Sequence, residues 1–168
     1  MKKLLIVAAS VLLLGAGCVS INLNSSPESV NSETDQPVVA PSTSNISVDL
    51  SDQNLAALPS YILERTDIEE LDISGNKMTG ALPAEIRHLS RLRVLNASNN
   101  QFTGVPAEIG QLTNLQVLDY SHNQLTGLPN ELGNLSNLQV LDLTGNDVSE
   151  YDLEIIRLAL PAGTEIRW

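Results

Sequence analysis

Between about residue 45 and residue 148, short stretches of alternating apolar and polar residues recur along the chain. Leu118 and Tyr120, for example, alternate with polar neighbours, and this spacing predicts a short strand with one buried face. A proline-containing stretch follows each predicted strand, and its apolar residues are more widely spaced. Each unit of the pattern therefore predicts one short strand and one segment that returns the chain along a second layer.

The pattern repeats with a nearly constant period. The units begin at Asn45, Ile68, Leu92, Leu115 and Leu138, with spacings of 23, 24, 23 and 23 residues. One such unit cannot bury its own apolar face, so we expect the copies to stack with their strands parallel. Paired strands lie about 4.8 Å apart, whereas the return segments are thicker. The stack is therefore expected to curve, with the strands on the inside.

An asparagine stands at the ninth position of four units. We expect the chain to turn sharply there, which exposes backbone N–H and C=O groups that an interior cannot leave unpaired. A carboxamide offers both donors and acceptors, so stacked asparagines are suited to bridge the turns of adjacent units. Gln53 replaces the asparagine in a degenerate first unit. The predicted structural asparagine ladder consists of Asn76, Asn100, Asn123 and Asn146.

These units resemble the leucine-rich-repeat family, whose signature is L-x-x-L-x-L-x-x-N-x-L. The last unit matches it with Leu138, Leu141, Leu143, Asn146 and Val148. The resemblance covers residues 45–148, which is about five repeats. It implies an α/β fold, a short curved leucine-rich-repeat solenoid shaped like a horseshoe. The family has a parallel β-sheet on the concave face and irregular or 3₁₀ segments on the convex side, and a C-terminal helix is expected to cap the core.

The sixth position departs from the family pattern in two adjacent repeats. Ala97 and Tyr120 stand there in place of the usual aliphatic residue. A small and a large side chain placed side by side conserve the volume of a core. We therefore expect the two positions to be energetically coupled.

Residues 149–168 no longer follow the repeat and predict a C-terminal cap made of a helix and a short strand. Ser149 followed by Asp152 is typical of a capped helix start, and apolar residues at helical spacing follow. A helix and a charged edge strand cover the end of a solenoid core and discourage pairing with other strands. We interpret Trp168 as part of this cap, with a binding anchor as the alternative.

The first 18 residues have the order of a secretory signal: two lysines, an apolar run, then small residues ending at Cys18. The run is shorter than the ~20 residues that span a bilayer. The end of the segment resembles the lipobox of bacterial lipoproteins, which implies a signal peptide over residues 1–17 and lipidation, such as palmitate, on Cys18. Ordinary cleavage with an incidental cysteine is the alternative. Val19, rather than aspartate, favours the outer membrane if the cell has one.

Residues 18–44 follow as a segment rich in Ser, Asn and Pro that contains no basic residue. Such a composition buries too little apolar surface to offset the entropy of ordering, so we expect a disordered tether behind the lipidated cysteine. The predicted domain organisation is a signal peptide over 1–17, a tether over 18–44, repeats over 45–148 and a cap over 149–168.

The composition excludes several classes of protein. A net charge of −11 argues against a nucleic-acid partner, because proteins that neutralise phosphates carry a basic patch. One cysteine and two histidines supply neither an internal disulfide nor the ligands of a zinc site. The sequence has no G-x-S-x-G motif, no glycine-rich phosphate loop and no histidine pair at ligand spacing. We therefore expect no enzyme, no cofactor and no metal.

Residues that flank the inward leucines are expected to form columns on the concave face. Each column contains the residues at one position of successive repeats and is named by that position. The third column contains three valines that we expect to be exposed, and they predict an apolar contact stripe unless valine merely suits a strand. The fifth column is acidic, which suggests a cationic ligand, unless aspartate is simply the residue that the family usually has at this position. The eighth position varies most. The predicted protein-binding residues are Glu70, Val94, Asn96, Asn99, Val117, Asp119, His122, Val140 and Asp142.

These features predict an extracytoplasmic monomer, lipid-anchored to a bacterial cell membrane, that binds a protein or peptide on its concave face. The acidic surface favours a neutral or basic partner, because charge steers association. A structural component of the envelope, whose solenoid contacts its neighbours without a discrete ligand, is the alternative.

Overall fold

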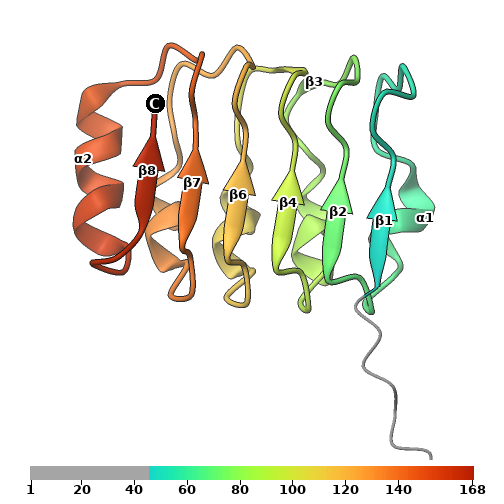
Figure 1. Cartoon of the computed structure of the whole chain (residues 1–168), viewed down its shortest axis with the longest axis horizontal. Coiled ribbons are helices and arrows are strands. Elements are labelled where there is room, and N and C mark those ends of the chain that lie inside the picture. Colours follow the sequence, from blue (N-terminus) through green and yellow to red (C-terminus); the bar gives the residue numbers. More distant parts are fainter. Residues whose placement is uncertain (1–45) are drawn as a thin grey trace, which may run out of the picture. The chain divides into compact units, whose positions relative to one another are not determined.

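A computed structural model describes residues 46–168, and it contains one parallel sheet of six short strands in chain order (Figure 1). The strands are β1 (Ser47–Asp49), β2 (Glu70–Asp72), β4 (Val94–Asn96), β6 (Val117–Asp119), β7 (Val140–Asp142) and β8 (Glu165–Arg167). The first five belong to successive repeats, and β8 follows the last helix. The predicted signal peptide, the lipidation of Cys18 and the tether lie outside the described residues.

The register of the sheet is the same throughout. Leu71 lies opposite Leu95, Leu95 opposite Leu118 and Leu118 opposite Leu141. The last strand continues the series, with Ile166 opposite Leu141. Residues at the same position of successive repeats therefore stand side by side in columns across the sheet.

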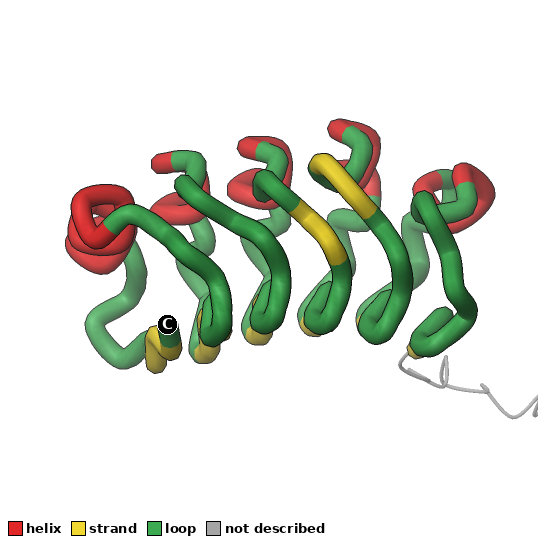
Figure 2. Tube along the Cα trace, turned by 90° about the horizontal axis from the view of Figure 1, so that it is seen from above, coloured by secondary structure: helices red, strands yellow, loops and turns green. Residues whose placement is uncertain are grey.

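Short helices form the opposite side of the solenoid. Three are 3₁₀ helices and two are α-helices: η1 (Ala84–His88), η2 (Ala107–Gln111), η3 (Asn130–Asn134), α1 (Ser60–Leu63) and α2 (Glu150–Ala159). A proline precedes each 3₁₀ helix, where its fixed φ and missing backbone donor are tolerated. Figure 2 shows the strands of the six-stranded sheet on the inner side of a shallow arc and the helices on the outer side. The predicted fold class is confirmed, including the concave sheet, the 3₁₀ convex side and the helical cap.

A second sheet joins the second and third repeats beyond the asparagine turns. It consists of two parallel strands, β3 (Thr79–Gly80) and β5 (Gln101–Phe102). The two strands pair in register, with Thr79 opposite Gln101. This pairing adds backbone hydrogen bonds between repeats at a place where the concave sheet has already ended.

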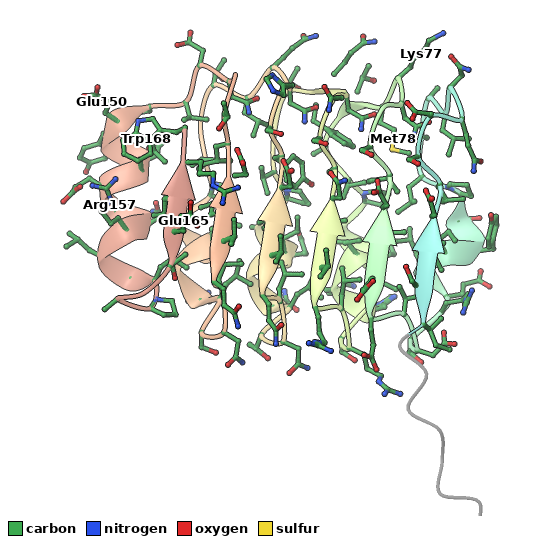
Figure 3. All side chains as sticks on the ribbon, viewed as in Figure 1. Lys77, Met78, Glu150, Arg157, Glu165 and Trp168 are labelled. Atoms are coloured by element: carbon green, nitrogen blue, oxygen red, sulfur yellow. The ribbon has the colours of Figure 1, made fainter. Side chains whose placement is uncertain are left out.

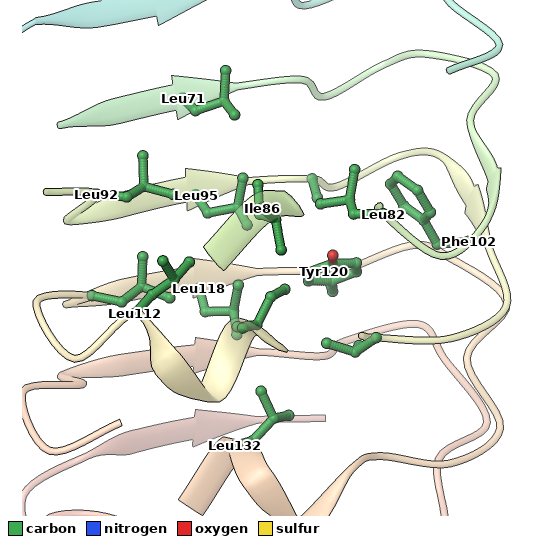
Figure 4. Packing of buried hydrophobic residues seen from close by; sticks show 14 of the residues in the cluster. Leu71, Leu82, Ile86, Leu92, Leu95, Phe102, Leu112, Leu118, Tyr120 and Leu132 are labelled. Atoms are coloured by element: carbon green, nitrogen blue, oxygen red, sulfur yellow. The ribbon is translucent and has the colours of Figure 1, made fainter. Parts of the chain in front are cut away.

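The core between the sheet and the convex helices is mostly aliphatic. Leu95 and Leu118 enter it from the strands, and Ile86 and Leu132 enter it from the 3₁₀ helices (Figure 4). Ile109 of η2 is buried in the same way, and none of the five has exposed surface. Full burial of such a side chain contributes about 1.5–3 kcal/mol. Because each repeat covers the apolar side chains of the next, the stability of the solenoid comes mainly from stacking.

One layer of this core is aromatic. Tyr120 and Phe102 are fully buried, and their ring centroids lie 5.5 Å apart with a tilt of 57° between the planes. Ala97, which is also fully buried, occupies the same position as Tyr120 in the preceding repeat. The Tyr120 hydroxyl is buried without a hydrogen-bond partner among residues 46–168, and burial raises the pKa of Tyr120 far above its usual value.

Two glycines let the convex helices approach closely. A side chain at Gly110 would overlap the backbone of Glu131 in the next repeat. A Cβ at Gly133 would lie 2.5 Å from the Cβ of Ala159 in α2. The equivalent residue of η1 is Arg87, which is exposed. Glycine at these two places therefore sets how near η2, η3 and α2 pack.

The start of the cap helix differs from the predicted one. Ser149 precedes α2, but its side chain makes no hydrogen bond to the first turn. Asp152 instead accepts a hydrogen bond from the backbone N–H of Leu128, at 3.2 Å, and so ties the helix to the preceding repeat. Ser149 is therefore the N-cap residue of α2, as predicted, but the expected capping hydrogen bond is absent. Within residues 46–168, no helix is both long enough and apolar enough to cross a membrane.

Candidate binding surface on the concave face

The third column of the sheet contains the valine stripe, which consists of Val94, Val117 and Val140. Parallel pairing places the three side by side on β4, β6 and β7. They are half-buried rather than exposed as the sequence suggested, because side chains on strands about 4.8 Å apart cover one another. Glu70 and Glu165 continue the column at its two ends. The stripe is therefore an apolar strip bordered by acidic side chains.

A shallow hollow of about 250 Å³ lies on the concave face beside the stripe. It extends over β1, β2 and β4 and brings three of the predicted binding residues together. Its lining combines carboxylates with one valine of the stripe, so it offers both an apolar and an acidic contact. The lining residues are Ser47, Asp49, Glu70, Leu71, Asp72, Val94 and Asn96.

The fifth column hydrogen-bonds to the chain itself. Asp72 Oδ1 accepts hydrogen bonds from the backbone N–H and the hydroxyl of Ser74, at 2.8 and 2.6 Å. Asp119 accepts one from the N–H of Ser121 at 2.8 Å. The Asn96 side-chain amide donates to Asp72 Oδ2 across the strands, at 2.9 Å. In all five repeats an Asp or Asn is followed two residues later by Ser or Thr, and this recurring pair has a structural role, which is to hold the turn at the end of each strand.

Asp142 is the last acidic residue of this column. Its Oδ2 lies 3.4 Å from Nη1 of Arg167, the residue at the same position of β8. Desolvation raises the pKa of Asp142, but hydrogen bonds from Thr144 and Arg167 outweigh it, so the pKa lies below its usual value. In the described part of the chain, no three His, Cys, Asp or Glu side chains gather closely enough to hold a metal ion.

The eighth column is explained by backbone conformation. All five of its residues have positive φ, between 54° and 75°. This left-handed region is costly for most residues but tolerated by Gly, Asn, Asp and His, and those are the four types that occur in the column. The variation therefore follows a backbone requirement that the sequence analysis missed. The five residues are Asp52, Gly75, Asn99, His122 and Gly145.

Side chains of the eighth column lean toward the next repeat. The His122 ring covers Gly145, where an added Cβ would lie 2.6 Å from Nδ1, and the Asp52 carboxylate covers Gly75 in the same way. Asn99 and His122 are exposed and lie three residues beyond the ends of their strands. Both predicted binding residues therefore lie at the edge of the concave sheet rather than beside the valine stripe.

The ninth-position asparagines bridge adjacent repeats. The Asn100 amide donates to the carbonyl of Ile73 in the preceding repeat, at 2.9 Å, and to that of Ala97 in its own, at 3.3 Å. Its Oδ1 accepts the N–H of Met78, at 3.1 Å. Three further asparagines bridge repeats in the same way: Asn76, Asn123 and Asn146. Asn146, next to the cap, is less buried than the other three.

A second asparagine ladder, which the sequence analysis missed, lies where the strands begin. Asn114 donates to the carbonyl of Ser90 at 2.8 Å, and Asn137 donates to that of Thr113 at 2.7 Å. Each bond connects a repeat to the one before it. The recurring L-T-N-L and L-S-N-L segments were a signal for this ladder. Both edges of the concave sheet are therefore held by side-chain amides.

A polar hollow of about 390 Å³ lies at the same edge. At one end of it the buried Glu69 pairs with Arg91 at 3.0 Å and with Arg93 at 3.7 Å. Arg93 also donates to the Gln116 side chain, at 3.2 Å. Because the two arginines share one carboxylate, this edge is less negative than the floor of the concave face.

Comparison with known proteins gives the family of these repeats. A family model described as "Leucine Rich Repeat" matches residues 67–89 and 91–112, and one described as "Leucine Rich repeats (2 copies)" matches residues 113–153. Receptor-like protein 47 of Arabidopsis thaliana is 42% identical over 51 residues, which are 30% of this chain and 6% of that protein.

Two solved structures extend the comparison. A leucine-rich-repeat protein of Leptospira interrogans is 43% identical with a TM-score of 0.63, over 67% of this chain and 28% of that one. The BIR3–SERK2 complex from Arabidopsis thaliana contains a chain that is 34% identical with a TM-score of 0.57, over 62% of this chain and 57% of that one. The sheet aligns the repeats that the family models match in columns, together with the first repeat before them. The chain therefore belongs to the leucine-rich-repeat family.

Proposed function

We propose that this protein is a binding module that recognises a protein or peptide on its concave face. The valine stripe carries the proposal, because it is a contiguous apolar strip on an otherwise polar sheet surface. Similar leucine-rich-repeat structures include a protein complex, BIR3–SERK2. Proteins of this family are typically binding scaffolds rather than enzymes, which agrees with the absence of catalytic motifs from the sequence.

The chemistry of the face indicates the kind of partner. An apolar side chain that packs on Val94, Val117 and Val140 would remove their remaining surface from water, at roughly 25 cal/mol per Å². The acidic fifth column and Glu70 surround the stripe with negative charge. Charge of this sign speeds encounter with a neutral or basic segment and repels an acidic one. The proposed ligand is therefore an apolar peptide segment with neutral or basic flanks.

We propose further that this module lies outside the cytoplasm on a lipid anchor. The residues that support it are the signal-like segment over 1–17 and Cys18, the single cysteine of the chain, at the end of a lipobox-like sequence. The tether over 18–44 would have a relaxed reach of about 28 Å for its flexible part, which leaves the concave face free to meet partners near the membrane.

Substitution of the stripe tests the binding site. Replacing Val94, Val117 and Val140 with lysine adds three charges to the stripe and should abolish binding, because a lysine ammonium group is costly to bury against an apolar ligand. The measurement is capture of partners from envelope extracts by immobilised protein of residues 19–168. The charge-matched control replaces three exposed residues of the convex 3₁₀ helices with lysine: Gln111, Asn130 and Asn134.

The wild type and the control should retain the same partner, and the stripe variant should lose it while its circular dichroism stays unchanged. A stripe variant that still captures the partner would contradict binding on the concave face. A wild type that captures nothing would favour the alternative, a structural component of the envelope without a discrete ligand.

The anchor has a separate test. Cys18→Ser should abolish incorporation of labelled fatty acid and should move the protein from the membrane fraction to the soluble fraction, because the thiol is the site of lipid attachment. Unchanged fractionation would contradict the anchor and leave the proposal for the concave face untouched.

A further inference from the structure

The cap helix α2 carries apolar residues on two opposite sides. Leu153 and Ile156 face inward and are buried in the core, on the side where α2 packs against η3. Tyr151 and Leu158 are 74% and 79% exposed, which makes them the most exposed large apolar side chains within residues 46–168. An ordinary surface helix has one apolar stripe and one polar side. The outer side of α2 is therefore apolar where a solenoid end would be expected to be polar.

The outer apolar side is a stripe of three residues, Tyr151, Ile155 and Leu158, which we call the outer stripe. Their spacing of four and then three residues places them on one face of a helix. Ile155 lies at the centre and is only partly exposed, between its two exposed neighbours. The outer stripe therefore looks nearly the same from either end of the helix, because one large exposed apolar residue lies on each side of Ile155.

Charged residues flank the outer stripe on one side. Glu154 and Arg157 are three residues apart and exposed. The Arg157 guanidinium lies 4.9 Å from the centre of the Trp168 ring, and Figure 3 shows the two side chains together between α2 and β8. Trp168 is 58% exposed, so the tryptophan packs against the arginine and still enlarges the apolar surface of this end.

We infer that the outer stripe of α2 pairs with the outer stripe of a second copy of this chain, with the two helices antiparallel. A twofold axis at Ile155 would place each Ile155 against its equivalent and Tyr151 of one copy against Leu158 of the other. The same axis brings Glu154 of each copy to the flank that carries Arg157 of its partner. The surface is thus self-complementary in both shape and charge, as a twofold interface requires.

The charges around the stripe argue against a membrane as the occupant. Glu150, Asp152 and Glu154 lie on the same helix, and Arg157 is the one basic residue of α2. Helices that lie on membrane surfaces carry basic residues on their polar face, because lipid head groups are often anionic. A second copy instead supplies one arginine for one glutamate at each end of the pair.

The size of the surface sets the strength of the pairing. A helix of ten residues is about 15 Å long, and two such helices cover less than the roughly 800 Å² per partner of a standard stable interface. The dimer is therefore weak, and it forms at high protein concentration or where copies are concentrated on a surface.

Sedimentation equilibrium tests the pairing with residues 19–168, which include every residue that the structure describes. From about 10 µM to about 1 mM, the range in which so small an interface should associate, the wild type is expected to show a monomer–dimer equilibrium. Leu158→Ser should raise the dissociation constant at least tenfold. Tyr61→Ser is the matched control, because Tyr61 is an exposed aromatic residue, 58% exposed, on α1 at the other end of the solenoid.

A charge exchange makes the test specific for antiparallel pairing. Glu154→Arg alone places two arginines against each other and should weaken the dimer, whereas adding Arg157→Glu should restore it. A wild type that stays monomeric throughout this range would overturn the inference. So would an equal effect of Tyr61→Ser and Leu158→Ser, or a double exchange that fails to restore pairing. Binding of the wild type, but not of Leu158→Ser, to phosphatidylglycerol vesicles without dimerisation would also overturn it, in favour of a membrane.

Discussion

At the scale of single residues, the eighth position of each repeat shows how a backbone requirement can look like a variable binding surface. Asn99 and His122 were predicted as ligand contacts because their column varies. The structure gives both a φ of 54°, and the other members of the column are also in the left-handed region. The residue types follow from that conformation, so their variation carries no information about a ligand.

Two substitutions at Asn99 separate conformation from contact. Asn99→Gly should leave the free energy of unfolding nearly unchanged, because glycine adopts positive φ without strain. Asn99→Ala should be less stable than Asn99→Gly by about 1 kcal/mol, because alanine pays the cost of the left-handed region. Urea denaturation of the two variants measures the difference. Equal midpoints would show that the backbone at this position relaxes at no cost.

At the scale of elements, neighbouring repeats are coupled wherever one side chain compensates for another. Ala97 and Tyr120 occupy equivalent positions in adjacent repeats, and both are fully buried. Phe102 completes this layer by packing on the tyrosine ring. The sequence indicated the pairing of a small with a large residue, but the contribution of Phe102 became visible only when the second sheet brought that residue to the same layer.

Overpacking tests this coupling. Ala97→Leu should destabilise the protein by about 1–3 kcal/mol, because the added side chain has no space in a filled layer. Tyr120→Leu removes volume from the adjacent position and should recover part of that loss in the double variant. A cycle of the four proteins in urea denaturation should give a coupling free energy of at least about 0.5 kcal/mol. Strictly additive effects would mean that the two side chains do not share space.

The cap shows how elements differ from their sequence signals. Ser149 and Asp152 have the spacing of a helix cap, yet Asp152 bonds to the N–H of Leu128. The reason is that the helix packs against η3 in the repeat that begins at Leu115, where the N–H of Leu128 is close enough to bind the carboxylate. Local spacing predicted the helix correctly, but tertiary contact decided what its first turn binds.

At the scale of the whole molecule, the acidic fifth column has a structural cost and a structural use. Its members line up across the sheet at the same register, so their charges repel one another. Hydrogen bonds from the turn residues, the amide of Asn96 and Arg167 offset this repulsion. The concave face can therefore remain negative without losing the fold.

Acid should weaken the fold through Asp142. Its pKa is lower in the folded protein than its usual value of 3.8, so the carboxylate contributes stability above about pH 4 that is lost as the pH falls through the folded pKa. Asp142→Asn should reduce the loss of stability between pH 7 and pH 3, by less than about 1 kcal/mol. Asparagine fits this column, because Asn96 occupies it in the third repeat. Parallel pH profiles of urea midpoints for the two proteins would contradict this role.

Much of the fold and part of the candidate site were predictable. The spacing of residues predicted the period, the strands, the ninth-position asparagines and the columns. This was possible because a solenoid repeats one local structure and each copy contacts only its neighbours. The valine stripe was predicted as exposed, and adjacent strands half-bury it. The ladder of Asn114 and Asn137 was missed, because their carbonyl partners lie one repeat earlier and become close only after stacking.

The sequence by itself determined that this chain is a curved stack of leucine-rich repeats with a helical cap, because periodic burial leaves few other ways to cover the apolar face of each unit. Only the tertiary structure decided which polar residues are bound within the fold and which remain available. The fifth column forms hydrogen bonds that hold the turns, and the eighth column consists of residues that tolerate positive φ. The valine stripe and the outer stripe of α2, in contrast, keep exposed apolar surface. That distinction depends on distances between repeats, and a local pattern does not contain them.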